Sequence, residues 1–413
     1  MKFSGKIMLT VFSAAACFPS AWPETEPPLT LNIIVAAARG NNKELLAMRR
    51  RLAVAQALIE ENAARPNPSI ELERQTPLDA GYQEFKIYQP FALNGRITLA
   101  KQTAQAEAAA FSADIAALEN EIAAAAKTAY YGFRLAGERI RFEEANLKFS
   151  MDMLNSMQLQ FQTGQATNAD LARAKVETAR NKYRLEAAQS KLKAAEAELN
   201  CCMGRPPQIP ITVADNGMFL NAPSASRDPA FETTLAAALS SRPDLAASAL
   251  RAEAAETGAA LEKRKRIPDL TLGWITGASP EERYSKLAVT LELPLWYRNR
   301  GAIARAEAET TARAQDTDSL NLSVRKQIYT AWLARVLAAK RVRAARETVL
   351  LVNDLRKTAS LDYLSGKSGL AAFYETNRIF IEENLNYLDG LAEYFEKSVE
   401  LEKAAGSIAA GEL

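Results

Sequence analysis

Histidine is absent from this sequence of 413 residues. Imidazole is the commonest general base near neutral pH and a common transition-metal ligand, so its absence argues against Ser-His-Asp hydrolases and zinc enzymes. The sequence also contains no phosphate-binding loop, no nucleophile–base pair and no cluster with metal-ligand spacing. We therefore predict a protein that is not an enzyme and that has no cofactor and no metal site.

The sequence also lacks a large net charge, because 51 basic residues nearly balance 49 acidic residues and the net charge is +2. No overall field favours nucleic acid or anionic lipid, and we predict no nucleic-acid partner. Long apolar runs are also lacking, since no stretch beyond the N-terminus reaches the roughly 18 residues that a membrane helix needs. Any part of this chain that spans a membrane must therefore consist of strands.

The N-terminus has the layout of a secretory signal peptide, which we place at residues 1–21. Lys2 and Lys6 precede an apolar run from Ile7 to Ala16, and Pro19 follows it. The run is too short to cross a bilayer. A buried N-terminal helix is the less favoured alternative.

Cysteines are few: Cys17, Cys201 and Cys202. The adjacent pair lies where a helix is expected to end, and we interpret it as packing, with metal binding or a vicinal disulfide as the lesser alternative. Cys17 follows three alanines and partly resembles a bacterial lipoprotein cleavage site. Ala14 stands where leucine is usual, so lipidation of Cys17 is the minority interpretation.

Four landmarks occur twice in the same order, at an offset near 200 residues. They are the triplets Ala36-Ala37-Ala38 and Ala236-Ala237-Ala238, the prolines Pro68 and Pro268, the prolines Pro90 and Pro294, and the segments Phe161–Gly164 and Tyr363–Gly366. The period is too long for a solenoid and indicates an ancient duplication. We place the first repeat at 22–203, a connecting segment at 204–230, the second repeat at 231–405 and a C-terminal tail at 406–413.

Each copy contains a predicted β-hairpin, at 69–89 and at 269–293. In the second, Leu287, Val289, Leu291 and Leu293 alternate with more polar residues, which gives one apolar and one polar face. Two interpretations remain open. The apolar face packs on the protein's own helices, or it meets lipid while the other face meets water.

Proline-free helices flank the hairpins. The segments 97–161 and 302–363 would form rods of about 97 Å and about 93 Å at 1.5 Å per residue. The segments 169–199 and 370–404 return alongside them and carry apolar residues at heptad spacing, which predicts coiled-coil packing. These seams are Leu185, Ala188, Leu192, Ala195 and Leu199, and Ile381, Leu385, Leu388, Ala392, Phe395 and Val399.

Four strands per chain cannot close a barrel, and open strand edges are not tolerated in lipid. Three chains would supply twelve strands and leave room for an aqueous lumen, whereas eight strands are filled by their side chains. The predicted fold class is mainly α with a small β part, internally duplicated. A long α-helical coiled-coil barrel would accompany a four-strand contribution per chain to an oligomeric transmembrane β-barrel.

This plan resembles the outer membrane factors, the TolC-like family. The matching segments are Phe161–Lys175 (FQTGQATNADLARAK), Tyr363–Gly366 (YLSG), Ala197–Leu199 (AEL) and Gly204–Pro206 (GRP). Ser241–Leu245 (SRPDL) and Leu293–Gly301 (LPLWYRNRG) look most like the cobalt–zinc–cadmium and related heavy-metal efflux branch. The resemblance extends over nearly the whole mature chain.

The resemblance implies a homotrimeric, passive efflux channel in the outer membrane of a Gram-negative bacterium, embedded in outer-membrane lipid and extending into the periplasm. A periplasmic adaptor (membrane fusion) protein and an inner-membrane pump would be its partners, and heavy-metal cations would be a candidate cargo. The alternatives are a periplasmic adaptor and a structural coiled-coil protein without a pore.

The resemblance also implies a periplasmic gate near two helical turns, at Gly164 and Gly366, which would dock the adaptor. Asp170, Tyr363 and Glu375 stand at gate positions of the family. Two further positions depart from its pattern, because Ser368 replaces an arginine and Ala372 replaces an aspartate of the best-known member. Asp170 is also explained as an acid near a helix N-terminus, and Tyr363 as a packed aromatic.

Overall fold

The computed structural model describes residues 28–74, 81–214, 230–279 and 282–406. The expected signal peptide (1–21), the candidate lipidation site Cys17, most of the connecting segment and the end of the C-terminal tail lie outside these described residues.

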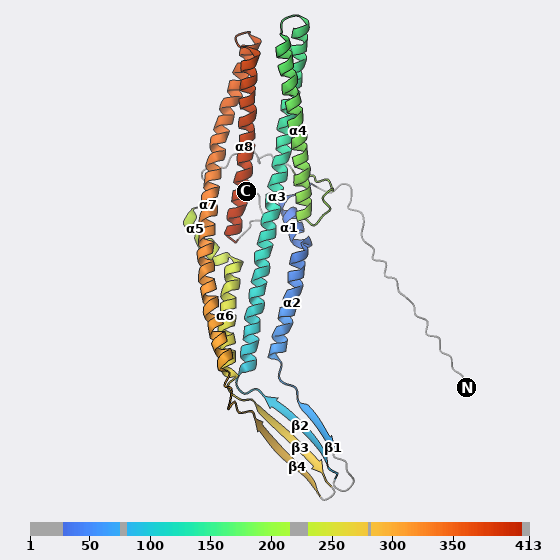
Figure 1. Cartoon of the computed structure of the whole chain (residues 1–413), viewed down its shortest axis with the longest axis vertical. Helices are drawn as coiled ribbons and strands as arrows, with labels where there is room; N and C mark the ends of the chain where they lie inside the picture. The colour runs from blue at the N-terminus through green and yellow to red at the C-terminus, as the bar shows by residue number, and fades with distance from the viewer. Residues whose placement is uncertain (1–27, 75–80, 215–229, 280–281, 407–413) are drawn as a thin grey trace, which may run out of the picture.

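The element order α-α-β-β-α-α occurs twice along the chain (Figure 1). The first copy consists of α1 (Leu31–Asn41), α2 (Lys43–Ala63), β1 (Ser69–Arg74), β2 (Gln83–Phe91), α3 (Arg96–Gln162) and α4 (Asn168–Cys202). The second consists of α5 (Phe231–Ser241), α6 (Pro243–Arg264), β3 (Leu270–Ala278), β4 (Arg283–Leu291), α7 (Arg300–Leu364) and α8 (Leu370–Ala404). The fold class predicted from the sequence is confirmed.

Both long helices begin in the same unusual backbone conformation. Gly95 precedes α3 with φ of 72°, and Asn299 precedes α7 with φ of 53°, both in the left-handed region. Glycine and asparagine are the residues that enter this region at least cost. The chain therefore turns from strand to helix in the same way in both copies.

Each returning helix ends against the break between the two leading helices of its own copy. The Asn41 side chain donates to the Met203 carbonyl (2.9 Å) at the end of α4, and Arg242 donates to the Ala404 carbonyl (2.8 Å) at the end of α8. These bonds satisfy carbonyls that a helix C-terminus leaves without partners. Each leading pair and its returning helix thus lie end to end along one long helix (Figure 1).

Gly204 allows the close approach at the first of these junctions. It has φ of 71°, and a Cβ atom here would lie 2.9 Å from the Asn41 Cβ. Both the backbone conformation and the contact require glycine. Cys201 and Cys202 lie just before it as free thiols, exposed and half-buried respectively.

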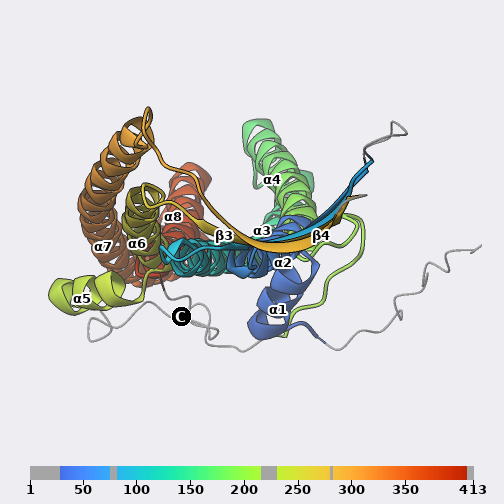
Figure 2. The ribbon, with the colours of Figure 1, turned by 90° about the horizontal axis from the view of Figure 1, so that it is seen from below.

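The four strands form one antiparallel sheet of order β1-β2-β3-β4. The two hairpins join through β2 and β3, with Gln83 opposite Ala278 and Phe91 opposite Leu270. The sheet is curved and lies at one end of the molecule, beyond the ends of the helices (Figures 1 and 2). β1 and β4 are its free edges.

The main core lies midway along the helices, where α3 meets α1, α7 and α8. Tyr131 of α3 stacks on Phe395 of α8 with ring centroids 4.4 Å apart. Small residues, among them Ala123 and Ala126, are fully buried there and allow close helix packing.

The heptad prediction holds in part. Ala188 and Leu199 of the first seam, and Ile381, Phe395 and Val399 of the second, are buried. Ala392 was wrongly placed in the second seam, since it is exposed while Leu391 is buried. The reason is that α8 packs on α3 as well as on α7, so its buried residues do not follow a single heptad seam.

Among the described residues, no helix is long and apolar enough to cross a membrane.

Candidate functional site

One face of the sheet is apolar and exposed. Because side chains alternate between faces, Leu72, Trp274, Leu287 and Val289 share a face, and they are 83%, 52%, 77% and 63% exposed. A soluble hairpin would bury such side chains against helices. These are left bare, which favours the second of the two interpretations drawn from the alternation.

The opposite face is polar and internally paired. Lys86 contacts Glu73 (2.6 Å) and Glu84 (2.9 Å), and Glu84 also contacts Lys286 (3.5 Å) and the Tyr284 hydroxyl. The network extends from β1 to β4. Charged side chains are costly to place in hydrocarbon, so this face is suited to water.

The first helical turn predicted as a docking tip joins α3 to α4. The Gly164 N–H donates to the Phe161 carbonyl (3.1 Å), and the Gln165 N–H donates to the Gln160 carbonyl (2.8 Å). This pair of bonds, with Gly164 at φ of 74°, is a Schellman cap.

The second tip, between α7 and α8, has the same backbone. The Gly366 N–H donates to the Tyr363 carbonyl (3.1 Å), and the Lys367 N–H donates to the Asp362 carbonyl (2.8 Å), with Gly366 at φ of 72°. The two tips therefore present similar turns at the same end of the molecule, opposite to the sheet (Figure 1).

Asp170 belongs to the capping box that begins α4. Its backbone N–H donates to the Thr167 hydroxyl oxygen (3.2 Å), and its carboxylate accepts from the Thr167 N–H (3.2 Å). The Thr167 hydroxyl also donates to this carboxylate (2.6 Å). These hydrogen bonds, the hydroxyl first, lower the pKa of the Asp170 carboxyl. The carboxylate thus has a local structural role whether or not it acts in a gate.

Tyr363 lies between the two helical hairpins. Its ring stacks on Phe373 at 5.5 Å between centroids, and its hydroxyl lies 3.5 Å from the Gln160 side-chain oxygen on α3. Burial, and then the charge of Asp170, raise the pKa of the Tyr363 hydroxyl. The charge of Asp170 therefore acts on the Tyr363 hydroxyl.

An apolar cluster packs against Tyr363. Met157 and Leu171 from the first hairpin are buried with Leu370 from the second, and Tyr363 packs against them. The tips are thus connected within one chain.

Glu375 does not join this group. It is exposed and pairs with Arg378 (2.6 Å) one turn along its own helix. The neighbouring Tyr374 faces the first hairpin instead, and burial, followed by the charge of Glu177, raises its pKa to about 12. No local pattern in the sequence singles out Tyr374, because a tyrosine in a helix is ordinarily a packing residue.

Arg356 forms a second connection between the hairpins. Its guanidinium lies 4.3 Å from the ring centroid of Phe149 on α3 and 4.2 Å from that of Phe380 on α8. A cation between two aromatic faces is stabilised by both rings. Burial lowers the pKa of Arg356. No short-range sequence signal marks this site, since its three residues come from three helices.

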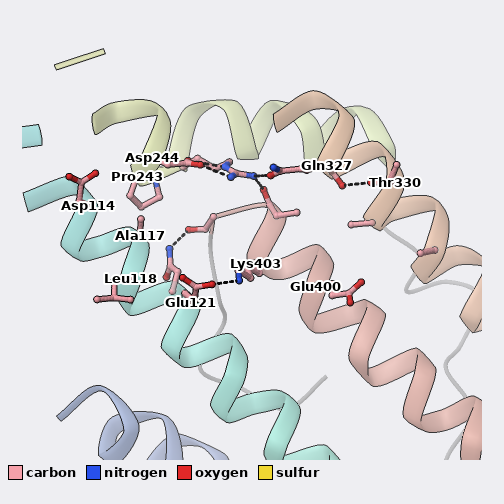
Figure 3. A pocket seen from close by; sticks show the side chains of 16 residues that line it. Asp114, Ala117, Leu118, Glu121, Pro243, Asp244, Gln327, Thr330, Glu400 and Lys403 are labelled. Carbon is pink, nitrogen blue, oxygen red and sulfur yellow. Dashed lines mark hydrogen bonds and ion pairs between the residues drawn. The ribbon is translucent and has the colours of Figure 1, made fainter. Parts of the chain in front are cut away.

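An open pocket of about 700 Å³ lies where α3, α6, α7 and the end of α8 meet. Figure 3 shows Lys403 bound to Glu121 (2.7 Å) at its edge. Asp244 binds Arg242 (2.5 Å). The Asn120 amide donates to the Gly406 carbonyl (2.8 Å). These contacts hold the ends of the helices together at this junction.

Nothing in the described part of the chain groups three or more cysteine, aspartate or glutamate side chains in a way that could hold a metal ion.

Comparison with known proteins agrees with this geometry. Residues 234–407, which span the second copy, match the family described as outer membrane efflux protein. The second copy of this chain is therefore similar to that family. The resemblance to the outer membrane factors inferred from the sequence is thereby confirmed.

One relative of this chain is the cobalt-zinc-cadmium resistance protein CzcC of Cupriavidus metallidurans. It is 22% identical over 93% of this chain and 91% of the relative.

Two solved structures are similar in fold along most of their length. The channel protein CusC matches with a TM-score of 0.77 and 15% identity, covering 91% of this chain and 92% of that one. The open state of the MtrE outer membrane channel of Neisseria gonorrhoeae matches with a TM-score of 0.76 and 19% identity, covering 91% and 89%. At these identities the likeness concerns the fold.

Proposed function

We propose that this protein is the outer-membrane channel of a tripartite efflux system and acts as a passive conduit. One observation supports this most directly. A four-stranded sheet with one bare apolar face, one charged and paired face and two free edges stands at the end of a long helical body.

The free edges of β1 and β4 imply association. Unpaired backbone groups are costly in lipid, so the sheet must be continued by other copies until it closes. Three chains would form a twelve-stranded β-barrel with an aqueous lumen, with the paired face of Lys86 and Glu84 inside and the face of Leu287 outside. The same threefold arrangement would place the helices of the three chains in one helical cylinder.

The helical end would lie in the periplasm of a Gram-negative bacterium and receive an adaptor protein at the tips of Gly164 and Gly366. An inner-membrane pump would then supply the energy for export.

A conduit of this kind requires no catalytic group, and we propose that the chain is not an enzyme. A periplasmic adaptor or a pore-free coiled coil would not need the bare apolar face of the sheet.

Heavy-metal cations are the proposed cargo. The support is the similarity to CzcC, a cobalt-zinc-cadmium resistance protein. Deleting the gene should lower the tolerated concentration of cobalt, zinc or cadmium in the source bacterium. Unchanged tolerance to all three metals would overturn this assignment of cargo and leave the channel itself untouched.

We propose that Asp170 and Tyr363 form part of a gate at the periplasmic end, while Glu375 contributes charge to its outer surface. The support is that the charge of Asp170 acts on the Tyr363 hydroxyl, which lies near the same tips. The pairing of Glu375 with Arg378 argues for a secondary role of that carboxylate.

Membrane fractionation followed by unheated gel electrophoresis tests the central proposal. The channel should fractionate with the outer membrane and migrate as a trimer that heating converts to a monomer. A mature protein that stays monomeric and needs no detergent would contradict it.

A further inference from the structure

Three crossings between strands and helices meet at the base of the sheet. The Asn299 side chain donates to the backbone carbonyl of Glu262 (2.9 Å) and to its carboxylate (2.8 Å). This pair of bonds fixes the segment Leu293–Arg300, which enters α7, against the segment that leaves α6. On the other side, Asn94 donates to the Ile267 carbonyl (3.0 Å).

Four exposed arginines gather on this junction: Arg264, Arg266, Arg298 and Arg300. Within the described part of the chain none of them has an ion-pair partner, whereas the neighbouring cations do. Lys263 binds Glu307 (2.8 Å) and Lys265 binds Glu262 (2.6 Å).

The nearby carboxylates do not cancel this charge. Asp269 is occupied by Arg96 (2.6 Å), and Glu262 by Lys265 and Asn299. Glu292 is the remaining acidic side chain of these segments. The balanced charge of the whole chain therefore conceals a local basic patch.

Exposed apolar and aromatic side chains lie on the same segment as Arg298. Trp296 is 99% exposed, and Leu293, Leu295 and Tyr297 are all more than half exposed. An uncovered indole leaves a large apolar area in water. Leu293 continues the alternation of Leu287, Val289 and Leu291, so the apolar face of the sheet extends up to this segment.

Tryptophan and tyrosine beside basic side chains are typical of the boundary between hydrocarbon and water. A soluble anion would use the arginines and leave the indole bare, whereas a lipid uses both. The chemistry therefore favours a lipid with a negatively charged phosphate headgroup.

We propose that Arg264, Arg266, Arg298 and Arg300, together with Trp296, form a binding surface for anionic phospholipid. The arginines bind the phosphate headgroups, and Trp296 enters the interface between headgroups and acyl chains. This inference rests on the proposed function, because the sheet must stand in a membrane for the patch to meet its headgroups.

The surface belongs to the second copy alone. The corresponding crossing of the first copy, Pro90–Arg96, contains neither tryptophan nor tyrosine, and its arginine is bound to Asp269. A trimer would consequently bear three such patches, one per chain, rather than six.

Quenching of Trp296 fluorescence by brominated lipids tests the inference on the purified channel in a neutral detergent. Brominated phosphatidylglycerol is compared with brominated phosphatidylcholine, and the Trp296→Phe variant supplies the signal of the other tryptophans. We expect quenching of Trp296 at concentrations of phosphatidylglycerol about tenfold or more below those of phosphatidylcholine.

A variant with all four arginines changed to Gln should lose this preference. The matched control changes four exposed arginines elsewhere on the helices to Gln, namely Arg50, Arg51, Arg325 and Arg346, and should keep it. Two double variants each change half of the patch: Arg264→Gln with Arg266→Gln, and Arg298→Gln with Arg300→Gln. Each should lose part of the preference for phosphatidylglycerol. They provide the test if the fourfold variant does not fold.

Equal quenching by the two lipids in the unaltered protein would overturn the inference, as would a preference that survives the fourfold change or disappears equally in the control. Migration of the same samples as trimers in unheated gels is measured in parallel. A channel that forms trimers but shows no lipid preference refutes the patch alone, whereas loss of the trimer in the unaltered protein refutes the proposed function.

Discussion

The Lys127 ammonium, fully buried in α3, lies 2.9 Å and 3.1 Å from the two carboxylate oxygens of Glu402 near the end of α8. This ion pair joins the long helix of the first copy to the last helix of the second. Burial raises the pKa of the Glu402 carboxyl, and the charge of Lys127 acts in the opposite direction. This ion pair therefore links the two copies, and the removal of either residue leaves the other without its partner.

Replacing Lys127 alone should be costly. Lys127→Ala leaves the Glu402 carboxylate partly buried without its main cation, and we expect a loss of about 3–5 kcal/mol in stability. The combined variant Lys127→Ala, Glu402→Ala should lose less than the sum of the two single changes. Thermal unfolding of the detergent-solubilised protein, followed by circular dichroism, measures all three.

The surface pair Lys397 and Glu400, separated by 2.9 Å, provides the control for this prediction. Lys397→Ala should cost about 1 kcal/mol or less, as exposed pairs do. Equal effects of Lys127→Ala and Lys397→Ala would show that burial does not strengthen the dependence of Glu402 on its partner.

Glu143 should make stability depend on pH. It is 2% exposed on α3, and burial raises the pKa of its carboxyl, while Arg184 and Arg139 act in the opposite direction. A raised pKa means that the folded state holds the proton more tightly than the unfolded state. Stability is therefore lost as pH rises from the ordinary value of 4.5 through the raised one.

The variant Glu143→Gln removes this penalty. It should unfold at a higher temperature than the unaltered protein at pH 7, and the gain should vanish below about pH 4, where the carboxyl is protonated in both states. Glu144→Gln, at an exposed position next to it, should change little at either pH. A gain that is the same at both pH values would rule out the titration of Glu143 as its cause.

The helical part of the fold could be predicted closely because its signals are local. Absence of proline over 97–161 and 302–363 predicted helices that the structure has at Arg96–Gln162 and Arg300–Leu364. The failure at Ala392 is physical, since a heptad pattern describes packing on one partner and α8 has two.

The joining of the two hairpins into one sheet could not be predicted, because nothing local selects the pairing of Gln83 with Ala278 over other registers. The residues of the candidate site likewise divide into those with a local sequence signal and those placed by the packing of distant segments. Gly164 and Gly366 were identified because a glycine after a long helix is a local signal. The place of Arg356 between Phe149 and Phe380 depends on how three distant segments pack.

The gate can be separated from the helix cap by two variants at the first tip. Both Asp170→Ala and Thr167→Ala break the capping box, at a cost of about 1 kcal/mol each. Only the first removes the negative charge that acts on Tyr363. If the carboxylate holds the gate closed, Asp170→Ala together with Tyr363→Phe should raise single-channel conductance in planar bilayers, and Thr167→Ala should not.

Equal conductance increases in both variants would assign the effect to loosening of α4. Unchanged conductance in the combined variant would remove Asp170 and Tyr363 from the gate.

The second tip offers a test in which the backbone alone changes. Gly366 has φ of 72° and nothing within 4 Å of the position that a Cβ atom would take, so Gly366→Ala adds no clash. It does force alanine into the left-handed region, at a cost of about 1–2 kcal/mol.

Gly369, three residues away, is the matched control, because it is equally uncrowded but has φ of −80°, which alanine adopts freely. If the turn docks the adaptor, Gly366→Ala should weaken binding of the purified adaptor in calorimetry or surface plasmon resonance, while Gly369→Ala should leave it near the unaltered value. Weakening of similar size in both variants would mean that the adaptor senses the added methyl groups rather than the shape of the turn, and the Schellman caps would then serve the fold and not the contact.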